Sequence, residues 1–276
     1  MSEPSFSVVI PTYGRPVLLR EAVASVLAQD VTDLECIVVD DAGDPGVDLD
    51  VRDDRVRVIR RERNGGLSAA RNTGIAASRG RAVTFVDDDD VLTPDRLSIA
   101  REGLARAPVA ICFRGNHPGG AAGRNRILDG DVRHSIADEA VPHVGQACVA
   151  REALVPFDEA LRAGEEIDWW LRVAAMHRVA TVPRIGYLFR IHDGERSGNG
   201  AAVRARSRRQ VLDRHAAYFR AHRTADAFQW MRVGLLAERA GDTAAARRAF
   251  ARSLVRRPSP RLIWHLGRSL AGGGRP

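Results

Sequence analysis

Residues 82–90 read Ala-Val-Thr-Phe-Val-Asp-Asp-Asp-Asp, an apolar segment that ends in four consecutive aspartates. The short apolar run predicts a buried strand over residues 82–86. Four adjacent carboxylates at a strand end repel one another strongly if they are unpaired. Two interpretations stay open for the run by itself: a metal site, or a solvated acidic turn before the helix start that Thr93-Pro94 indicates.

A divalent cation would remove the repulsion between these carboxylates. Mg²⁺ or Mn²⁺ prefers oxygen ligands and commonly binds one or two carboxylates together with substrate phosphates. Side chains alternate along a strand, so Asp87 and Asp89 would lie on the same side if the strand geometry continued. We expect Asp90 to belong only to the turn.

Short apolar segments alternate with helical patterns on both sides of this strand. Such alternation predicts an α/β fold with a mostly parallel sheet and right-handed crossovers. The predicted strands are 6–10, 34–39, 56–59, 82–86 and 109–113, and the predicted helices are 16–28, 67–78 and 94–106.

Polar residues follow three of the predicted strands at the point where each strand ends. Pro11-Thr12-Tyr13 follows the first strand, Asp40-Asp41 the second and Asp87–Asp90 the fourth. In an open parallel sheet, ligands bind outside the carboxyl ends of the strands. We therefore expect the three clusters to converge on one binding edge.

Two helix starts carry further candidate residues. Asn64-Gly65-Gly66 leads into a helix that contains Arg71, and glycines before a helix N-terminus suit a phosphate. Glu165, Glu166 and Asp168 open a helix predicted over 165–177. These carboxylates either complement the helix dipole or supply a general base.

The remaining chain divides into a loop-rich part and a helical part. Residues 114–145 are rich in Gly, Asn, His and Pro, and we expect an acceptor site there. Patterned sequence returns at 146–150, and strands are predicted over 179–182 and 186–191. From residue 201 the pattern is helical, with helices at 227–240 and 243–256 and a narrow apolar face on residues 263–270.

Charge is distributed unevenly along the chain. Residues 201–276 contain 17 arginines and 4 acidic residues, whereas residues 1–200 have a small acidic excess. We predict a catalytic domain over 1–200 and a basic helical extension over 201–276. The high isoelectric point belongs to the extension, so it does not indicate nucleic-acid binding. The extension is expected either to be a solvated surface or to contact a membrane or a protein.

Other features indicate a cytoplasmic protein. The three cysteines are odd in number and lie in apolar runs, which is typical of buried free thiols. Neither a signal peptide nor a membrane-spanning apolar stretch is evident in the sequence. We expect a cytoplasmic location, with peripheral contact at the inner face of the membrane as the alternative.

The strand ends and helix starts form an ordered set of motifs. These are Ser-Val-Val-Ile-Pro-Thr-Tyr at 7–13, Cys-Ile-Val-Val-Asp-Asp at 36–41, Asn-Gly-Gly-Leu-Ser-Ala-Ala-Arg-Asn-Thr-Gly at 64–74, Phe-Val-Asp-Asp-Asp-Asp at 85–90, and segments 164–172 and 187–197. In this order and spacing the set resembles glycosyltransferase family 2. The resemblance implies a GT-A fold and inverting transfer from a nucleoside diphosphate sugar.

The resemblance also implies roles for individual residues. Asp87 and Asp89 occupy the DxD positions for Mg²⁺ or Mn²⁺, and His192 would approach the diphosphate or the metal. Glu166 stands where the family has its catalytic base, usually an aspartate. The residues implied to bind the nucleotide-sugar are Pro11, Thr12, Tyr13, Asp41, Arg71 and Asp88.

Glu166 leaves two functions open. The longer side chain displaces the carboxylate by about one methylene, and misplacement on that scale affects catalysis. The alternative to a transferase is a catalytically impaired nucleotide-sugar-binding homologue that acts as a partner or scaffold. A nucleotidyltransferase or a dinucleotide oxidoreductase would need a glycine-rich signature after the first strand, which Pro11-Thr12-Tyr13 does not resemble.

The acceptor is less well defined by the resemblance. The chain lacks the Gln-x-x-Arg-Trp segment of processive synthases. We therefore expect a non-processive enzyme whose acceptor is a glycan, a lipid-linked sugar, a protein or a small molecule.

Overall fold

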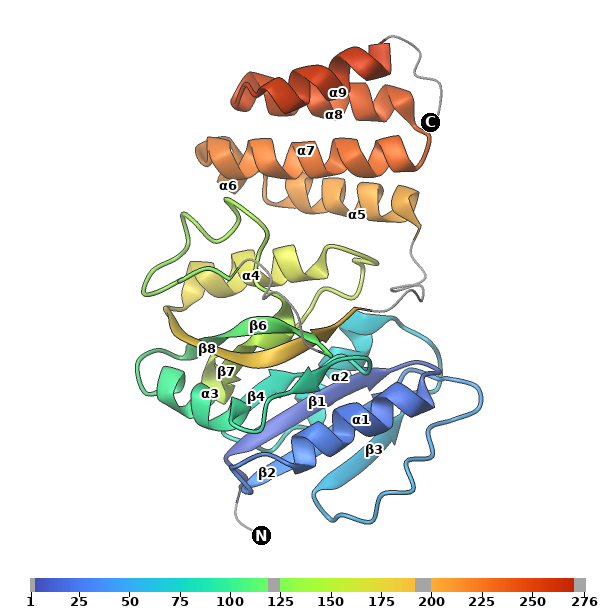
Figure 1. Cartoon of the computed structure of the whole chain (residues 1–276), viewed down its shortest axis with the longest axis vertical. Helices are drawn as coiled ribbons and strands as arrows, with labels where there is room; N and C mark the ends of the chain where they lie inside the picture. Colours follow the sequence, from blue (N-terminus) through green and yellow to red (C-terminus); the bar gives the residue numbers. More distant parts are fainter. Residues whose placement is uncertain (1–2, 119–124, 192–199, 271–276) are drawn as a thin grey trace. The chain divides into compact units, whose positions relative to one another are not determined.

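Four of the predicted strands, 6–10, 34–39, 56–59 and 82–86, lie side by side in one half of an eight-stranded sheet in the computed structural model (Figure 1), which describes residues 3–118, 125–191 and 200–270. Strand β1 pairs in parallel with β2 on one side and with β4 on the other. Both β1 and β2 are buried along their whole length, as their apolar runs require. The four strands of this half of the sheet are β1 (Phe6–Thr12), β2 (Leu34–Asp40), β3 (Val56–Arg60) and β4 (Ala82–Phe85).

The other half of the sheet makes it a mixed sheet. The strand order is β3-β2-β1-β4-β7-β6-β8-β5, and β7 lies antiparallel to both β4 and β6. The α/β fold class is confirmed, with antiparallel pairs added that the strand–helix alternation does not predict. The strands of this half are β5 (Val91–Leu92), β6 (Val109–His117), β7 (Ala147–Ala150) and β8 (Val179–Arg190). To within one residue, strands β6 and β8 contain the strands predicted at 109–113, 179–182 and 186–191, whereas β5 was not predicted.

Strand β8 joins two segments that we predicted as separate strands. Its register with β6 shifts between Cys112 and Phe113, which pair with Val182 and Ile185. The residues between these two partners bulge, and the bulge interrupts the apolar alternation. The sequence pattern therefore predicts two short strands where the backbone forms one.

Helices α1 (Pro16–Leu27), α2 (Leu67–Ala77) and α3 (Arg96–Leu104) follow the predictions within two residues at each end. Helix α1 begins at a proline, which tolerates the first helical position because its missing N–H has no partner there. Gly74 lets α2 approach β1, because a Cβ at this position would lie 2.2 Å from Val9 Cγ1. This close packing holds α2 against the sheet.

Contacts divide the chain into two units, and each is described here by itself. The first contains Met1–Arg133, Pro142–Glu159 and Trp169–Asp193, and the second contains His134–Val141, Ala160–Asp168 and Gly194–Pro276. Helix α4 (Glu165–Met176) thus contributes its first turn to the second unit. The boundary at residue 200 stays a prediction.

The second unit is mainly helical, as the pattern after residue 201 predicts. Asp242 caps α8 by accepting a 2.8 Å hydrogen bond from the Ala245 N–H. None of the helices in the described part of the chain is long and apolar enough to cross a membrane. The helices are α5 (Ala201–Arg214), α6 (Ala216–Ala221), α7 (Arg223–Arg239), α8 (Thr243–Arg256) and α9 (Pro260–Leu270).

Candidate functional site

The carboxyl ends of β1 and β4 are joined by side chains of the first unit. Thr12 Oγ1 donates a 2.6 Å hydrogen bond to Asp88 Oδ2, and Arg15 Nη1 lies 3.3 Å from Asp88 Oδ1. Burial raises the pKa of Asp88 to about 6, although Thr12 and Arg15 act in the opposite direction. Thr12 and Asp88, which were predicted to bind the donor, therefore lie in direct contact.

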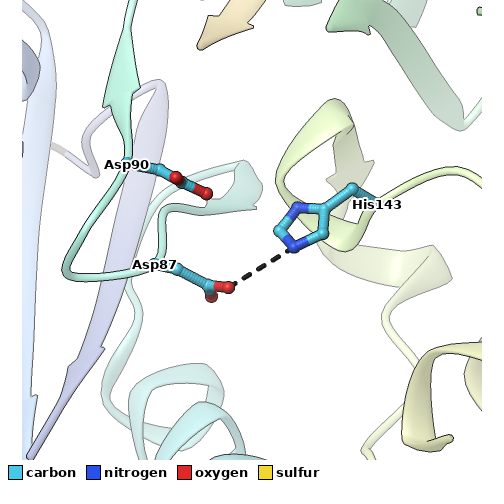
Figure 2. A group of neighbouring side chains, drawn as sticks. All are labelled: Asp87, Asp90 and His143. Atoms are coloured by element: carbon cyan, nitrogen blue, oxygen red, sulfur yellow. Dashed lines mark ion pairs between the residues drawn. The ribbon is translucent and has the colours of Figure 1, made fainter. Parts of the chain in front are cut away.

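Asp87 is held between a buried cation and an imidazole. Its Oδ1 accepts a 2.8 Å hydrogen bond from Arg71 Nη2, and its Oδ2 lies 3.4 Å from His143 Nε2 (Figure 2). Burial by itself would raise the pKa of Asp87, but Arg71 and His143 hold it well below its ordinary value. Asp87 is therefore a carboxylate at neutral pH.

The acidic run does not continue as a strand, and this changes which carboxylates meet. Strand β4 ends at Phe85, and the Asp90 N–H donates to the Asp87 carbonyl over 3.0 Å, which closes a turn. The turn brings Asp90 to the side of Asp87. The carboxylate of Asp89 instead contacts Arg15. The expected alternation of Asp87 and Asp89 on one side of a strand does not apply to a turn.

Asp87, Asp90 and His143 form a group that could hold a metal ion. One ligand atom from each lies within 4.8 Å of the others, and Figure 2 shows both carboxylates on the loop that faces His143. Burial and the neighbouring Asp87 raise the pKa of Asp90 to about 7. Two carboxylates and an imidazole fit a divalent cation, whose charge would offset the repulsion between the carboxylates.

His143 is positioned by a short 3-10 turn, η1 (Val144–Gln146). Its Nδ1 accepts a 3.3 Å hydrogen bond from the Gly145 N–H, which leaves Nε2 toward Asp87. Gly145 allows the turn to lie against Tyr187, because a Cβ here would be 2.1 Å from Tyr187 Cε2. The Tyr187 hydroxyl in turn donates to Asp90.

Sequence reasoning missed both Asp90 and His143 as site residues. Asp90 was assigned to the turn alone, although that turn is what places it beside Asp87. His143 lies at the end of the loop-rich segment 114–145, where no periodic pattern indicates its position. The available signal was His143-Val144-Gly145, a histidine and a glycine just before the patterned sequence returns at 146–150.

Asp41 organises the glycine loop after β3. It accepts hydrogen bonds from the N–H groups of Gly65 (3.0 Å) and Gly66 (2.7 Å), and it pairs with Arg61. Gly66 has a φ of +84°, which favours glycine. Asp41 thus connects the end of β2 to the start of α2, the helix that carries Arg71.

The other predicted donor-binding residues differ in exposure. Pro11 is buried in β1, whereas the side chain of Tyr13 is 58% exposed just beyond it. Arg71 is fully buried, and its guanidinium lies over the Phe157 ring at 5.2 Å from the centroid. Asn72 bonds the backbone N–H and carbonyl of Phe157, which secures that ring.

Glu166 and His192 are not placed relative to this group. Glu166 lies in the first turn of α4 and belongs to the second unit. In that unit the nearby Asp168 is buried and bonds His215 Nε2 at 2.8 Å, so this carboxylate joins the first turn of α4 to the residue between α5 and α6. His192 lies outside the described residues.

Known proteins resemble this chain in sequence and in fold. Residues 7–142 match the family described as Glycosyl transferase family 2. The succinoglycan biosynthesis protein ExoO of Rhizobium meliloti is 31% identical over 217 residues, which is 69% of this chain and 62% of ExoO. The chain therefore spans less than two thirds of this relative.

Two solved structures share the fold. S. aureus TarS in complex with UDP-GlcNAc has a TM-score of 0.63 at 16% identity, over 97% of this chain and 87% of TarS. The mannosyltransferase PcManGT from Pyrobaculum calidifontis, in complex with GDP-Man and Mn²⁺, has a TM-score of 0.60 at 18% identity, over 98% and 80% of the two chains.

Proposed function

This chain is a member of glycosyl transferase family 2, and we propose that it moves a sugar from a nucleoside diphosphate sugar to an acceptor hydroxyl. The transfer is metal-dependent, inverts the sugar carbon and is non-processive. The observation that carries the proposal is the pairing of Asp87 with Arg71 and His143 beside the Thr12–Asp88 hydrogen bond. These groups provide cationic, carboxylate and hydroxyl partners at the strand ends where such a donor would bind.

The donor is bound by the residues at the ends of β1, β2 and β4. Pro11, Thr12, Tyr13 and Asp41 contact the base and ribose, and Asp88 contacts the ribose or the donor sugar. Arg71 lies near the diphosphate. The structures of TarS with UDP-GlcNAc and of PcManGT with GDP-Man support a nucleotide-sugar ligand for this fold.

A divalent cation, Mg²⁺ or Mn²⁺, would be held by Asp87, Asp90 and His143. When bound, the cation stabilises the negative charge of the departing diphosphate. The ligand set expected from the family motif, Asp87 with Asp89 and His192, stays a competing prediction. The two sets share Asp87, so variants at the other positions distinguish them.

Glu166 takes the proton from the acceptor hydroxyl as that oxygen attacks the sugar. The proton moves to the Glu166 carboxylate, and the bond between the sugar carbon and the diphosphate oxygen breaks. Arg71 contributes a fixed positive charge that requires no rearrangement during the reaction. The acceptor is a glycan, a lipid-linked sugar, a protein or a small molecule.

A thermal-shift screen of nucleotide-sugars tests the proposal. UDP-, GDP- and dTDP-sugars are measured with and without Mn²⁺, since a ligand that binds the folded state raises the Tm. We expect one nucleotide class to raise the Tm by several degrees at about 100 times its Kd, and only with Mn²⁺. The absence of a shift with every donor would contradict the proposed function.

A further inference from the structure

Three arginines gather on helices α5 and α7 of the second unit. Arg204 and Arg208 are four residues apart, so they lie on the same face of α5. Arg208 Nη1 donates a hydrogen bond to Gln229 Oε1 on α7, which packs against α5 (Figure 1). Arg232 lies three residues beyond Gln229, on the same face of α7. Arg204, Arg208 and Arg232 therefore form one arginine cluster that spans the two helices.

The guanidinium groups of this cluster repel one another. Burial, together with repulsion from Arg232 and Arg204, lowers the pKa of Arg208 to about 10. Burial also lowers the pKa of Arg232, and Arg204 and Arg239 add to that effect. Arginines with such pKa values still carry their charge at pH 7. The fold therefore holds several like charges close together, which lowers its stability unless an anion binds them.

None of the three arginines forms an ion pair with a carboxylate among the residues that the structure describes. The next arginine along α5 does, since Arg209 Nε lies 3.7 Å from Asp213 Oδ2. Arg204 and Arg232 are exposed and Arg208 is half-buried. The cluster thus presents two accessible cations beside a third that Gln229 holds in position.

The start of α4 packs against this cluster within the same unit. Gly164 precedes the helix, and a Cβ at this position would lie 3.8 Å from Arg208 Cα. Glu165 and Glu166 follow directly. Although burial and the neighbouring arginines lower the pKa of Arg208, these two carboxylates act in the opposite direction, so they lie within electrostatic range of it. The arginine cluster therefore borders Glu166, the proposed base.

The balance of charge on this surface favours a ligand with two negative charges. The four arginines, Arg239 included, outnumber the two glutamates by two. A phosphate monoester carries about two negative charges at neutral pH and has three acceptor oxygens, so several guanidinium groups can bind it together. A diphosphate offers the same chemistry. A carboxylate has one charge, and a single guanidinium can satisfy both of its oxygens.

We propose that the arginine cluster binds a phosphate group of the sugar acceptor, next to Glu166. The acceptor is then a phosphorylated sugar, whose phosphate belongs either to a lipid carrier or to a soluble sugar phosphate. The arginines position this acceptor and take no part in the bonds that form and break. The inference rests on the proposed function, because it is the transfer reaction that requires an acceptor at Glu166.

Calorimetry with phosphate-bearing probes tests the site in the full chain. Glucose 6-phosphate represents a soluble acceptor, and farnesyl diphosphate represents a lipid-linked one. EDTA is present, so that metal-dependent binding at the donor site does not contribute. We expect at least one probe to bind with a Kd below about 1 mM, and glucose and glucuronate to bind at least about tenfold more weakly. The tighter of the two probes identifies the source of the phosphate.

Variants of the chain locate the binding site. The double variant Arg204→Gln/Arg232→Gln changes two exposed side chains and is expected to weaken phosphate binding about tenfold or more. The matched control is Arg206→Gln/Arg257→Gln, which removes the same charge from two other exposed positions and should leave the Kd within about twofold. Arg206 lies on the opposite side of α5 from Arg204 and Arg208. Circular dichroism checks that each variant is folded.

A further variant tests the position of the phosphate next to the base. Glu166→Gln removes a negative charge beside the cluster, so it is expected to strengthen phosphate binding by about twofold or more. An unchanged Kd in Glu166→Gln would show that the phosphate binds away from Glu166, which would overturn the acceptor site.

The outcomes separate this inference from the proposed function. If a nucleotide-sugar raises the Tm but no phosphate probe binds, the acceptor site is wrong and the transferase function stands. Equal binding of glucuronate, or equal binding to the Arg204→Gln/Arg232→Gln variant, would also overturn the site. If no nucleotide-sugar raises the Tm, the proposed function fails and the acceptor role fails with it, even if phosphate binds the cluster.

Discussion

The hydroxyl of Thr12 lies 2.6 Å from a carboxylate oxygen of Asp88, so a hydrogen bond joins the end of β1 to the turn after β4. Asp88 is only 6% exposed and carries two acidic neighbours. Ionisation of Asp88 therefore lowers the stability of the free protein. Carboxylates with such a raised pKa are common at binding and catalytic sites.

Asp88→Asn is expected to stabilise the free protein at pH 8 by about 1–2 kcal/mol. The folded pKa of about 6 is above the ordinary value of 3.8, so folding favours the protonated form. The cost of ionisation is present above pH 6 and disappears as the pH falls through about 6 toward 4. Denaturant unfolding of both proteins from pH 8 to pH 5 should show the difference shrinking. A constant difference would contradict the role of ionisation.

Asp90→Asn and His143→Ala are expected to weaken Mn²⁺ binding by about 10–100-fold, because each removes one ligand atom from the group around Asp87. Mn²⁺ affinity in the presence of the nucleotide is the measurement. Asp89→Asn is the matched control, since its carboxylate contacts Arg15. A larger loss in Asp89→Asn than in Asp90→Asn would instead support the ligand pair expected from the family motif.

Glu166→Gln is expected to lower kcat by at least about 100-fold while donor binding is retained, because the amide cannot accept the acceptor proton. Glu165→Gln changes the neighbouring carboxylate in the same helical turn and should retain most activity. Transfer rates and donor Tm shifts are measured for both. If the donor binds but wild-type protein transfers no sugar to any acceptor tested, the scaffold function is favoured. If transfer survives Glu166→Gln, another residue is the base.

Arg71→Met is expected to destabilise the fold by about 3–5 kcal/mol, because it leaves Asp87 without its buried cationic partner. Denaturant unfolding measures the loss. Adding Asp87→Asn removes the unpaired charge, so the double variant should recover part of the stability. Strictly additive losses in the two variants would show that the pair does not act as a unit.

Gly145→Ala is expected to lower stability by about 1–3 kcal/mol, because the added Cβ would lie 2.1 Å from the ring of Tyr187. The same displacement moves His143 and should weaken Mn²⁺ binding. Gly267→Ala serves as the control, since nothing lies within 4 Å of a Cβ at that position. If Gly145→Ala lowers stability but leaves the Mn²⁺ affinity unchanged, the position of this turn does not control metal binding by His143.

Local sequence patterns determined most of the secondary structure of this protein. The apolar runs at β1 and β2, the proline at the start of α1 and the Gly-Asp cap before α8 each act through neighbouring residues. The same local patterns predict that Thr12 and Asp88 lie at strand ends, and the structure shows a hydrogen bond between them.

Only the tertiary structure decided which of the acidic residues come together and with what partners. The turn at Asp88–Asp89 replaces strand alternation, and it sets Asp90 beside Asp87. His143 reaches them because β7 inserts antiparallel between β4 and β6 and brings the preceding turn to the same strand end. Periodicity reports the conformation of neighbouring residues, whereas this juxtaposition depends on packing between segments far apart in the chain, for which one sequence carries no local signal.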